Sequence, residues 1–384
     1  MRWIFWGSVV FLCYTYFGYL AVLWVRNLVS KRPVHAAPFF PSVSIVMIVR
    51  NEADVIERKL RNLETLAYPS SKKEIIVVSD GSTDKTNEIL KEFDRTDGPR
   101  IIFNSPPRGK AAGLNSAIEL TRGEILVFTD ARQRIENDAV QILMENFCDP
   151  SVGCVSGELM LGDERSNENT TGLSMYWKLE KRIREMESAS GSVVGATGAF
   201  YAVRRTLVPY VPEEIILDDV YIPMHVVREG SRVVFDNRAR AWDKPDLGRQ
   251  REYARKVRTL SGNYQLLRIA PWLLGNTNPI RFRFFSHKLT RLAAPFALLA
   301  CFATSCFLPG PIYTAAMSVQ LMCYGLGLLG FLSRPHGLLG TLTNAAFSFV
   351  MLNVATIAAL LNFLVGRKVL WSVAPEATVE SPNV

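Results

Sequence analysis

The chain has little cysteine and little histidine for its 384 residues. Its six cysteines form no Cys-x-x-Cys pair, and only four histidines are present to join them in a metal site. Most of the cysteines lie inside apolar segments, where cysteine is commonly a small buried apolar residue. The sequence therefore indicates neither a zinc site nor a disulfide framework. It also has no internal repeat and no low-complexity tract.

The net charge of +8 allows two interpretations. One is nucleic-acid binding, and the other is a membrane protein whose basic flanks face anionic lipid. Basic residues gather beside apolar segments, at Arg26, Lys31 and Arg32 and again through 249–291. This distribution favours the membrane, and we expect no nucleic-acid partner.

The apolar segments lie at the two ends of the chain. Trp3 to Val25 carries no charge, is long enough to span a membrane, and has tryptophans near both ends. A cleaved signal peptide is the alternative, but its apolar core would usually be shorter, and no clear small-x-small cleavage site follows. We expect a transmembrane helix within 1–30 and three more within 287–368, at Leu292–Leu308, Ile312–Leu332 and about Thr343–Val365.

The flanking charges give conflicting orientations. Arg26, Lys31 and Arg32 after the first span predict that the following domain is cytoplasmic, at the cell inner membrane. Four spans would then place the C-terminus outside, yet Arg367 and Lys368 follow the last span. We give the first span more weight, and a re-entrant last segment would also resolve the conflict.

Strands and helices alternate over residues 42–245. Near-continuous apolar strands at Val43–Val49, Ile75–Val78, Arg100–Phe103 and 125–128 are separated by segments with helical spacing. This order predicts an α/β fold with a doubly wound parallel sheet and right-handed crossovers.

The elements expected further along the chain are less regular. They are helices at 137–147, 173–187 and 219–228, strands at 152–160 and Arg232–Phe235, and a polar loop at 162–172. Residues 249–268 form a basic amphipathic helix, within an interfacial region at 246–286.

Several carboxylates stand at strand ends or helix starts, where α/β proteins bind ligands. They are Glu52, Asp80, Asp84, Asp130, Asp218 and Asp219. Taken singly, each has a structural explanation: Asp84 could cap a helix, and Asp80 could stabilise a turn with Gly81. Their convergence on one edge of a sheet favours a site.

Five segments together resemble membrane-bound family 2 glycosyltransferases related to cellulose and hyaluronan synthases. They are 43–52, 75–86, 109–118, 124–132 and 218–230. The resemblance covers about 42–268 and implies the GT-A fold, a Rossmann-like and mostly parallel sheet. It also implies a nucleotide-sugar donor, usually a UDP-sugar, with Mg²⁺ or Mn²⁺, and a lipid-linked or saccharide acceptor.

On the donor side, the resemblance places Asp80 against the uracil ring. It assigns nucleotide contacts to five further residues: Arg50, Asn51, Glu52, Arg108 and Lys110. Cations and backbone N–H groups suit a diphosphate, which agrees with this assignment. Solvated surface charge explains Arg108 and Lys110 equally well.

Asp130-Ala131-Arg132 matches the family's Asp-x-Asp metal motif, with one departure. Carboxylates are the expected ligands of hard divalent cations, but Arg132 cannot bind one. Two possibilities remain open. Asp130 holds the metal with diphosphate oxygens and water, or Arg132 partly replaces the metal's charge at the leaving group.

On the acceptor side, Asp218-Asp219 matches the family's Glu-Asp pair. The resemblance makes Asp219 the general base, and two adjacent carboxylates raise each other's pKa. The alternative is an acidic helix N-terminus. The glycine-rich segment before it, which includes Gly198, resembles the acceptor-side loop and would let an acceptor approach the backbone.

Residues 249–265 match the region of the family's Gln-x-x-Arg-Trp motif. Arg258 takes the arginine position and is a candidate to bind the diphosphate, while Arg255 replaces glutamine and Thr259 replaces tryptophan. That tryptophan stacks on the acceptor sugar in polymer-forming relatives, so its absence counts against a processive synthase.

The leading hypothesis is an inverting glycosyltransferase that works at the cytoplasmic face in exopolysaccharide or glycolipid synthesis. A processive polysaccharide synthase is the alternative within the same class. A third hypothesis is a non-catalytic membrane protein with a degenerate transferase domain, for which Arg132 is the argument.

Overall fold

The computed structural model describes residues 1–162, 174–244, 248–333 and 336–366. Most of the polar loop predicted at 162–172, and the basic residues Arg367 and Lys368, lie outside these ranges. Within them, eight strands form one sheet in the order β3-β2-β1-β4-β7-β6-β8-β5. The strands are β1 Val43–Val49, β2 Lys73–Asp80, β3 Arg100–Asn104, β4 Ile125–Thr129, β5 Arg134–Ile135, β6 Val152–Leu161, β7 Phe200–Arg204 and β8 Arg232–Asp243.

The mostly parallel α/β sheet is confirmed, with an antiparallel part that was not predicted. The first four strands pair in parallel, as does β6 with β8. β7 runs antiparallel to both β4 and β6, and the short strand β5 runs antiparallel to β8. β8 also continues past the predicted end at Phe235 to Asp243.

Helices cover both faces of the sheet because its strands are apolar on both sides. On one face, Ile45, Met47 and Val49 pack against α3 Ala53–Glu64, α4 Thr86–Phe93 and α6 Ala139–Glu145. On the other face, Val46 and Ile48 pack against α5 Lys110–Leu120, in the same core as α8 Asp218–Arg228. Four 3₁₀ helices complete the described domain, at Ser70–Lys72, Asn146–Cys148, Arg205–Leu207 and Pro271–Leu274.

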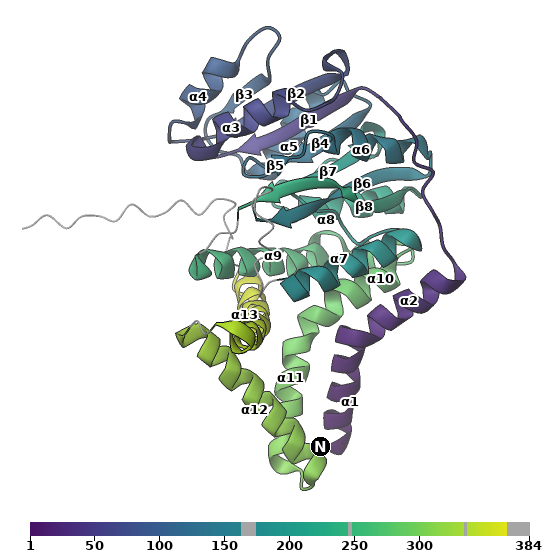
Figure 1. The fold of residues 1–384 in the computed structure, drawn as a ribbon, viewed down its shortest axis with the longest axis vertical. Helices are drawn as coiled ribbons and strands as arrows, with labels where there is room; N and C mark the ends of the chain where they lie inside the picture. Colours follow the sequence, from purple (N-terminus) through teal and green to yellow (C-terminus); the bar gives the residue numbers. More distant parts are fainter. Residues whose placement is uncertain (163–173, 245–247, 334–335, 367–384) are drawn as a thin grey trace, which may run out of the picture.

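A layer of helices separates the sheet from the apolar helices (Figure 1). It contains α7 Ser174–Ala189, α9 Arg249–Ile269 and α10 Arg281–Phe284. The apolar side of α9, which includes Val257 and Tyr264, packs on Leu292, Ala355 and Ala359 of the apolar helices. The amphipathic pattern of this helix is therefore satisfied largely by protein contacts.

Four stretches of the described chain are long and apolar enough to span a membrane, as predicted. They are Arg2–Val29, Arg281–Phe307, Pro311–Leu332 and Gly337–Leu364. The first contains α1 Arg2–Cys13 and α2 Tyr19–Val29 around a π-helical turn at Tyr14–Gly18. The second contains α10 and α11 Thr290–Phe307 around a π-helical turn at Phe285–Leu289.

The last apolar helix has a different direction from the others. In Figure 1, α1, α11 and α12 (Pro311–Leu332) run away from the sheet, whereas α13 (Gly337–Leu364) is seen nearly end-on. α13 packs against both α12 and α9. It therefore lies just beneath the helix layer and crosses the other apolar helices steeply.

Candidate active site

The predicted polar residues gather at the carboxyl edge of β1, β2 and β4, where parallel strands all end together. Arg50 follows β1, Asp80 ends β2, and Asp130 follows β4. The antiparallel neighbour β7 brings the preceding glycine-rich loop to the same edge, because Phe200 pairs with Thr129. The pairing of β4 with β7 thus brings the motif predicted to bind the donor next to the loop predicted to face the acceptor.

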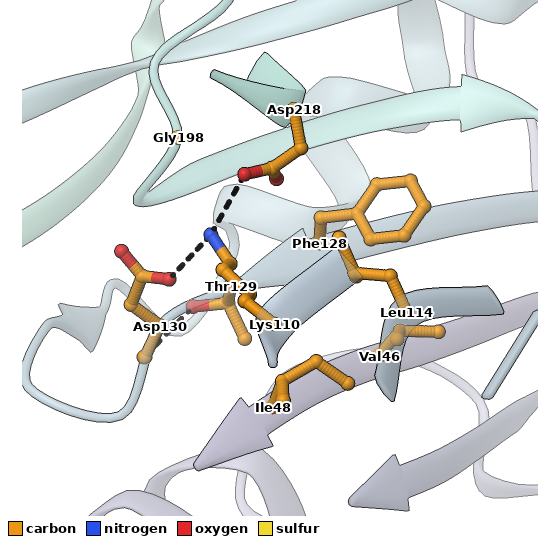
Figure 2. Close-up of a pocket in the computed structure, with 9 residues that line it drawn as sticks. All are labelled: Val46, Ile48, Lys110, Leu114, Phe128, Thr129, Asp130, Gly198 and Asp218. Carbon is orange, nitrogen blue, oxygen red and sulfur yellow. Dashed lines mark hydrogen bonds and ion pairs between the residues drawn. The ribbon is translucent and has the colours of Figure 1, made fainter. Parts of the chain in front are cut away.

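A lysine lies at the centre of the site, among three carboxylates. Lys110 Nζ is 3.4 Å from Asp130 Oδ1 and 3.3 Å from Asp218 Oδ1 (Figure 2). Burial opposes the charge of this ammonium, but Asp130, Asp218 and Asp219 together raise the pKa of Lys110 above its usual value. The lysine is therefore charged and holds the two motifs together. We call Lys110, Asp130, Asp218, Asp219 and Gly198 the central cluster.

The pKa of the Asp219 carboxyl lies above that of an ordinary aspartate. Burial and the neighbouring charge of Asp218 raise its pKa to about 6, although Lys110 opposes this shift. The carboxylate lies against Gly198, where the methyl group of an alanine would stand 2.8 Å from Asp219 Oδ2. The Asp219 carbonyl also accepts a hydrogen bond from Ala196 N at 2.7 Å. Because Gly198 has no side chain, the Asp219 carboxylate can lie directly against its backbone.

Asp80 is fully buried, and both of its oxygens accept backbone hydrogen bonds. Arg108 N donates to Oδ1 at 2.8 Å, and Gly109 N donates to Oδ2 at 2.7 Å. These bonds fix the loop that leads into α5, whose first residue is Lys110. Asp80 thus positions the central lysine, and its predicted contact with uracil stays a prediction.

The loop after β1 is joined to the loop after β2. Asn51 has a positive φ of 54°, and its side-chain oxygen accepts a hydrogen bond from Thr83 N at 2.8 Å. Asp84 accepts bonds from Ala53 N at 3.1 Å and Thr86 N at 3.0 Å, at the starts of α3 and α4. Asp84 therefore accepts backbone hydrogen bonds at the starts of two helices, although the N-cap residue of α4 itself is Lys85.

Arg132, the departure from the metal motif, pairs with Glu52. Its Nε lies 3.3 Å from Glu52 Oε1, and 63% of the arginine side chain is exposed. Burial raises the pKa of Glu52, while the arginine opposes that shift. Among the described residues, no group of three histidine, cysteine or carboxylate side chains is placed to hold a metal. Asp130, the carboxylate predicted to hold the metal, has 42% of its side chain exposed.

The predicted arginines are dispersed. Arg108 pairs with the exposed Glu213 at 3.3 Å, and Arg255 pairs with Glu252 on its own helix at 2.5 Å. Arg50 lies at the end of β1, and its buried Nε has no hydrogen-bond partner in the described part of the chain. The partner of Arg255 thus lies on α9 and outside the central cluster. The predicted roles of Arg255 and Arg258 at the diphosphate stay predictions.

A buried lysine beneath the site was not predicted. Lys59 on α3 donates hydrogen bonds to Thr129 Oγ1 at 2.8 Å and to the Gln133 carbonyl at 2.7 Å. Burial lowers its pKa to about 7, while Asp130 opposes the shift. It thereby supports the turn that carries Asp130. A sequence signal existed, because Lys59 lies three residues after Ile56, on the apolar stripe of the helix.

Comparison with known proteins agrees with this architecture. A mannosyltransferase from Pyrobaculum calidifontis, solved with GDP-Man and Mn²⁺, superposes with a TM-score of 0.72 at 22% identity. The superposition covers 94% of this chain and 99% of that one, so the two share a fold over nearly their whole lengths. The sheet has the fold of a GT-A-type protein.

Part of the chain is similar in sequence to a known family. Residues 44–210 match the model of Glycosyl transferase family 2. The poly-β-1,6-N-acetyl-D-glucosamine synthase of Staphylococcus aureus is 25% identical over 247 residues, 63% of this chain and 60% of that protein. The β-monoglucosyldiacylglycerol synthase of a Nostoc species is 30% identical over 230 residues, 56% of this chain and 47% of that protein. The chain thus matches at most about 60% of the length of these relatives.

Proposed function

We propose that the chain is an inverting glycosyltransferase that moves a sugar from a nucleotide-sugar to the hydroxyl of a lipid-linked or saccharide acceptor. The observation that carries this proposal is Asp219, a carboxylate with a pKa of about 6 that lies against the open backbone of Gly198. At neutral pH this group is mostly ionised and still basic enough to accept a proton.

The proposed reaction is a single displacement. Asp219 takes the acceptor's hydroxyl proton as the acceptor oxygen bonds to the anomeric carbon. The bond from that carbon to the diphosphate breaks, and its electron pair leaves with the nucleoside diphosphate. Attack opposite the leaving group inverts the anomeric centre. Lys110 would keep its positive charge between the acceptor base and the diphosphate.

The donor would lie along the ends of β1 and β2. Arg50 supports this placement, since a buried guanidinium nitrogen without a partner among the described residues suits a ligand that supplies an acceptor atom. Asp80, Asn51, Glu52 and Arg108 surround the same edge. We propose a UDP-sugar, on the resemblance of residues 75–86, and treat a GDP-sugar as the alternative because the P. calidifontis enzyme was solved with GDP-Man.

The residues present fit a divalent cation held by one protein carboxylate. Mg²⁺ commonly binds through one or two carboxylates together with substrate phosphates. Asp130 is the half-exposed carboxylate at the end of β4, and Arg132 is turned to Glu52. We therefore propose that Asp130 holds Mg²⁺ or Mn²⁺, which would neutralise charge on the diphosphate.

We also propose that the domain at 42–245 lies on the cytoplasmic side of the cell inner membrane and that α13 lies along the membrane surface. Support comes from its steep crossing of α12 and its packing against α9 (Figure 1). With three spans, Arg367 and Lys368 would share the side of the domain, which agrees with the positive-inside rule. A cysteine accessibility assay with a single cysteine introduced at position 368 tests this; labelling from the periplasm would contradict it.

The catalytic proposal is tested by nucleotide release from the purified full chain, with UDP- and GDP-sugars and with or without Mn²⁺. Asp219→Asn should lower the rate by about 10²-fold or more, in the range of general-base removal. Asp97→Asn, at an exposed loop carboxylate, is the matched control. Absence of release from every donor would contradict the proposal.

A processive synthase is the second candidate, because a polysaccharide synthase is among the relatives. The length of the product on a gel separates the two. A single added sugar supports the leading proposal, and a ladder of products supports the processive one. The proposed sites at Arg255 and Arg258 are tested in the same assay, where loss of donor affinity in Arg258→Gln would support a role at the diphosphate.

A further inference from the structure

A loop at 190–199 connects α7 to β7 and passes directly beside Asp219. The Ala196 amide donates a hydrogen bond to the Asp219 carbonyl at 2.7 Å. At Gly198, an added methyl group would stand 2.8 Å from Asp219 Oδ2. The position of this loop therefore decides how much space the Asp219 carboxylate has, and the contacts that hold the loop bear on the position of that carboxylate.

The first part of this loop is held through its backbone. Arg283, at the start of the second candidate span, donates hydrogen bonds to the carbonyls of Ser190 at 2.8 Å and Ser192 at 2.9 Å. The Val193 amide donates to the Val233 carbonyl of β8 at 2.9 Å. Because these contacts reach only the residues next to α7, the end of the loop beside β7 is held by other groups.

Thr197 fastens the other end of the loop. Its hydroxyl oxygen accepts a hydrogen bond from Arg184 Nη1 at 2.6 Å and lies 3.3 Å from Ser156 Oγ. The Thr197 amide donates to Ser156 Oγ at 2.9 Å. Thr197 is buried, so its polar atoms depend on these protein partners. Arg184 of α7 and Ser156 of β6 thus clamp the residue that directly precedes Gly198.

Arg184 is in turn fixed by a carboxylate. Its Nε lies 3.5 Å from Glu180 Oε1, one turn earlier on α7. His287 Nε2 and Arg291 Nη1, both from the second candidate span, lie 3.0 and 2.8 Å from the two oxygens of Glu180. Burial would raise the pKa of this carboxyl, but these neighbours hold it well below the usual range, so Glu180 is ionised. The guanidinium is therefore held between Glu180 and Thr197.

We propose that Arg184 is a positioning residue, which holds Thr197 and thereby keeps the 190–199 loop against the Asp219 carboxylate. This rests on the proposed function, in which Asp219 takes the proton of the acceptor hydroxyl. In this role Arg184 contacts neither the donor nor the acceptor. A charged, planar guanidinium makes a stronger and more directional hydrogen bond than a neutral donor. A displacement of about 1 Å at a reacting group can lower the rate about 10²-fold, so the loss of this one bond should be visible in the rate.

The rate test measures nucleotide release by the purified full chain, with the donor that the unmodified chain turns over fastest. Thr197→Val removes the hydroxyl and keeps the shape of the side chain, so kcat should fall at least about tenfold while KM for the donor stays unchanged. Thr197→Ser keeps the hydroxyl and should restore kcat. Thr65→Val, at an exposed threonine after α3, is the matched control. An unchanged kcat in Thr197→Val would overturn the proposal.

A double-mutant cycle separates positioning of the base from a general effect on folding. In Asp219→Asn the group that the loop positions is gone, so adding Thr197→Val should lower the remaining rate by less than about twofold. A further loss of about tenfold would show independent effects and would refute the positioning role. Arg184→Met removes the same bond from the other side, and it replaces Thr197→Val in the cycle if that variant does not fold.

Hydrogen exchange of backbone amides tests the same bond without turnover. Thr197→Val and Arg184→Met should each raise the exchange rate of amides 194–198 several-fold, while the amides of β2 stay unchanged. Unchanged exchange at 194–198 in both variants would overturn the proposal, whether or not the chain is active. If exchange rises as expected and the unmodified chain releases no nucleotide from any donor, the proposed function alone is refuted, and the hold of Arg184 on the loop stands.

Discussion

Replacing Asp219, the proposed base, with asparagine should stabilise the folded protein at neutral pH while removing activity. The folded protein holds the proton on Asp219 with a pKa of about 6, against an ordinary 3.8. Because the folded state binds this proton more tightly than the unfolded chain, ionisation of Asp219 opposes folding. The difference of roughly two pKa units corresponds to about 3 kcal/mol as an upper value. The neutral asparagine carries no such cost, so we expect a gain of about 1–3 kcal/mol above pH 7.

The pH dependence identifies the cause. The cost is fully present above pH values near 7, and it shrinks as the pH falls through about 6, where the folded protein takes up the proton. It is nearly gone at the ordinary pKa of 3.8. The stability advantage of Asp219→Asn should therefore be largest at about pH 8 and small at about pH 4.

Thermal unfolding followed by tryptophan fluorescence in detergent measures this advantage. A gain of about 1–3 kcal/mol in a domain of this size raises Tm by roughly 2–10 °C at pH 8. Asp97→Asn, at an exposed carboxylate, should leave Tm unchanged at every pH. A Tm for Asp219→Asn at or below that of the unmodified protein at pH 8 would refute the reasoning, as would a gap that does not narrow with acid.

Three further predictions concern the neighbours of this base. Gly198→Ala places a methyl group 2.8 Å from the Asp219 carboxylate. It should lower the rate of sugar transfer at least about tenfold with little change in Tm, since small displacements at a reacting group are costly. An unaltered rate would show that the carboxylate has room to move. Arg132→Asp should lower the Mn²⁺ concentration for half-maximal activity about tenfold, because a second carboxylate joins Asp130. Arg132→Gln is the control. An equal effect in both variants would show that the change comes from losing the ion pair between Arg132 and Glu52. Lys59→Met removes the donor of the hydrogen bonds to the Thr129 hydroxyl and the Gln133 carbonyl. The Tm should therefore fall by an amount that corresponds to about 1–3 kcal/mol, and the KM for the sugar donor should rise several-fold. A change in kcat alone would contradict a role of Lys59 in holding the turn that carries Asp130.

The features that could be predicted from the sequence depend on local patterns. Each of the strands β1 to β4 is a short apolar segment followed by a polar residue, so its existence and the position of Asp130 could be predicted. The apolar end segments were equally clear, because length and lack of charge are sufficient criteria for a candidate span. Family resemblance then supplied the proposed roles of Asp219 and Asp130, which composition and periodicity do not contain.

The errors and omissions concern contacts between distant segments. β7 has the same apolar pattern whether it pairs in parallel or antiparallel, so its direction was decided by its fit between β4 and β6. For Asp80, the predicted contact with uracil stays a prediction, and nothing in the sequence indicated the backbone hydrogen bonds that it accepts from Arg108 and Gly109. His287 gave no signal, because its two carboxylate partners lie on α7, about a hundred residues earlier.

The sequence by itself therefore determined which segments are strands, helices and candidate spans, and that a carboxylate follows β4. Those features depend on periodicity, length and residue type within one short segment. Only the tertiary structure decided that Lys110 lies between Asp130 and Asp218, that Arg132 pairs with Glu52, and that Gly198 lies against the Asp219 carboxylate. Charges separated by tens to hundreds of residues interact only after the sheet and the helix layer have packed, and the pKa values of the site follow from that packing.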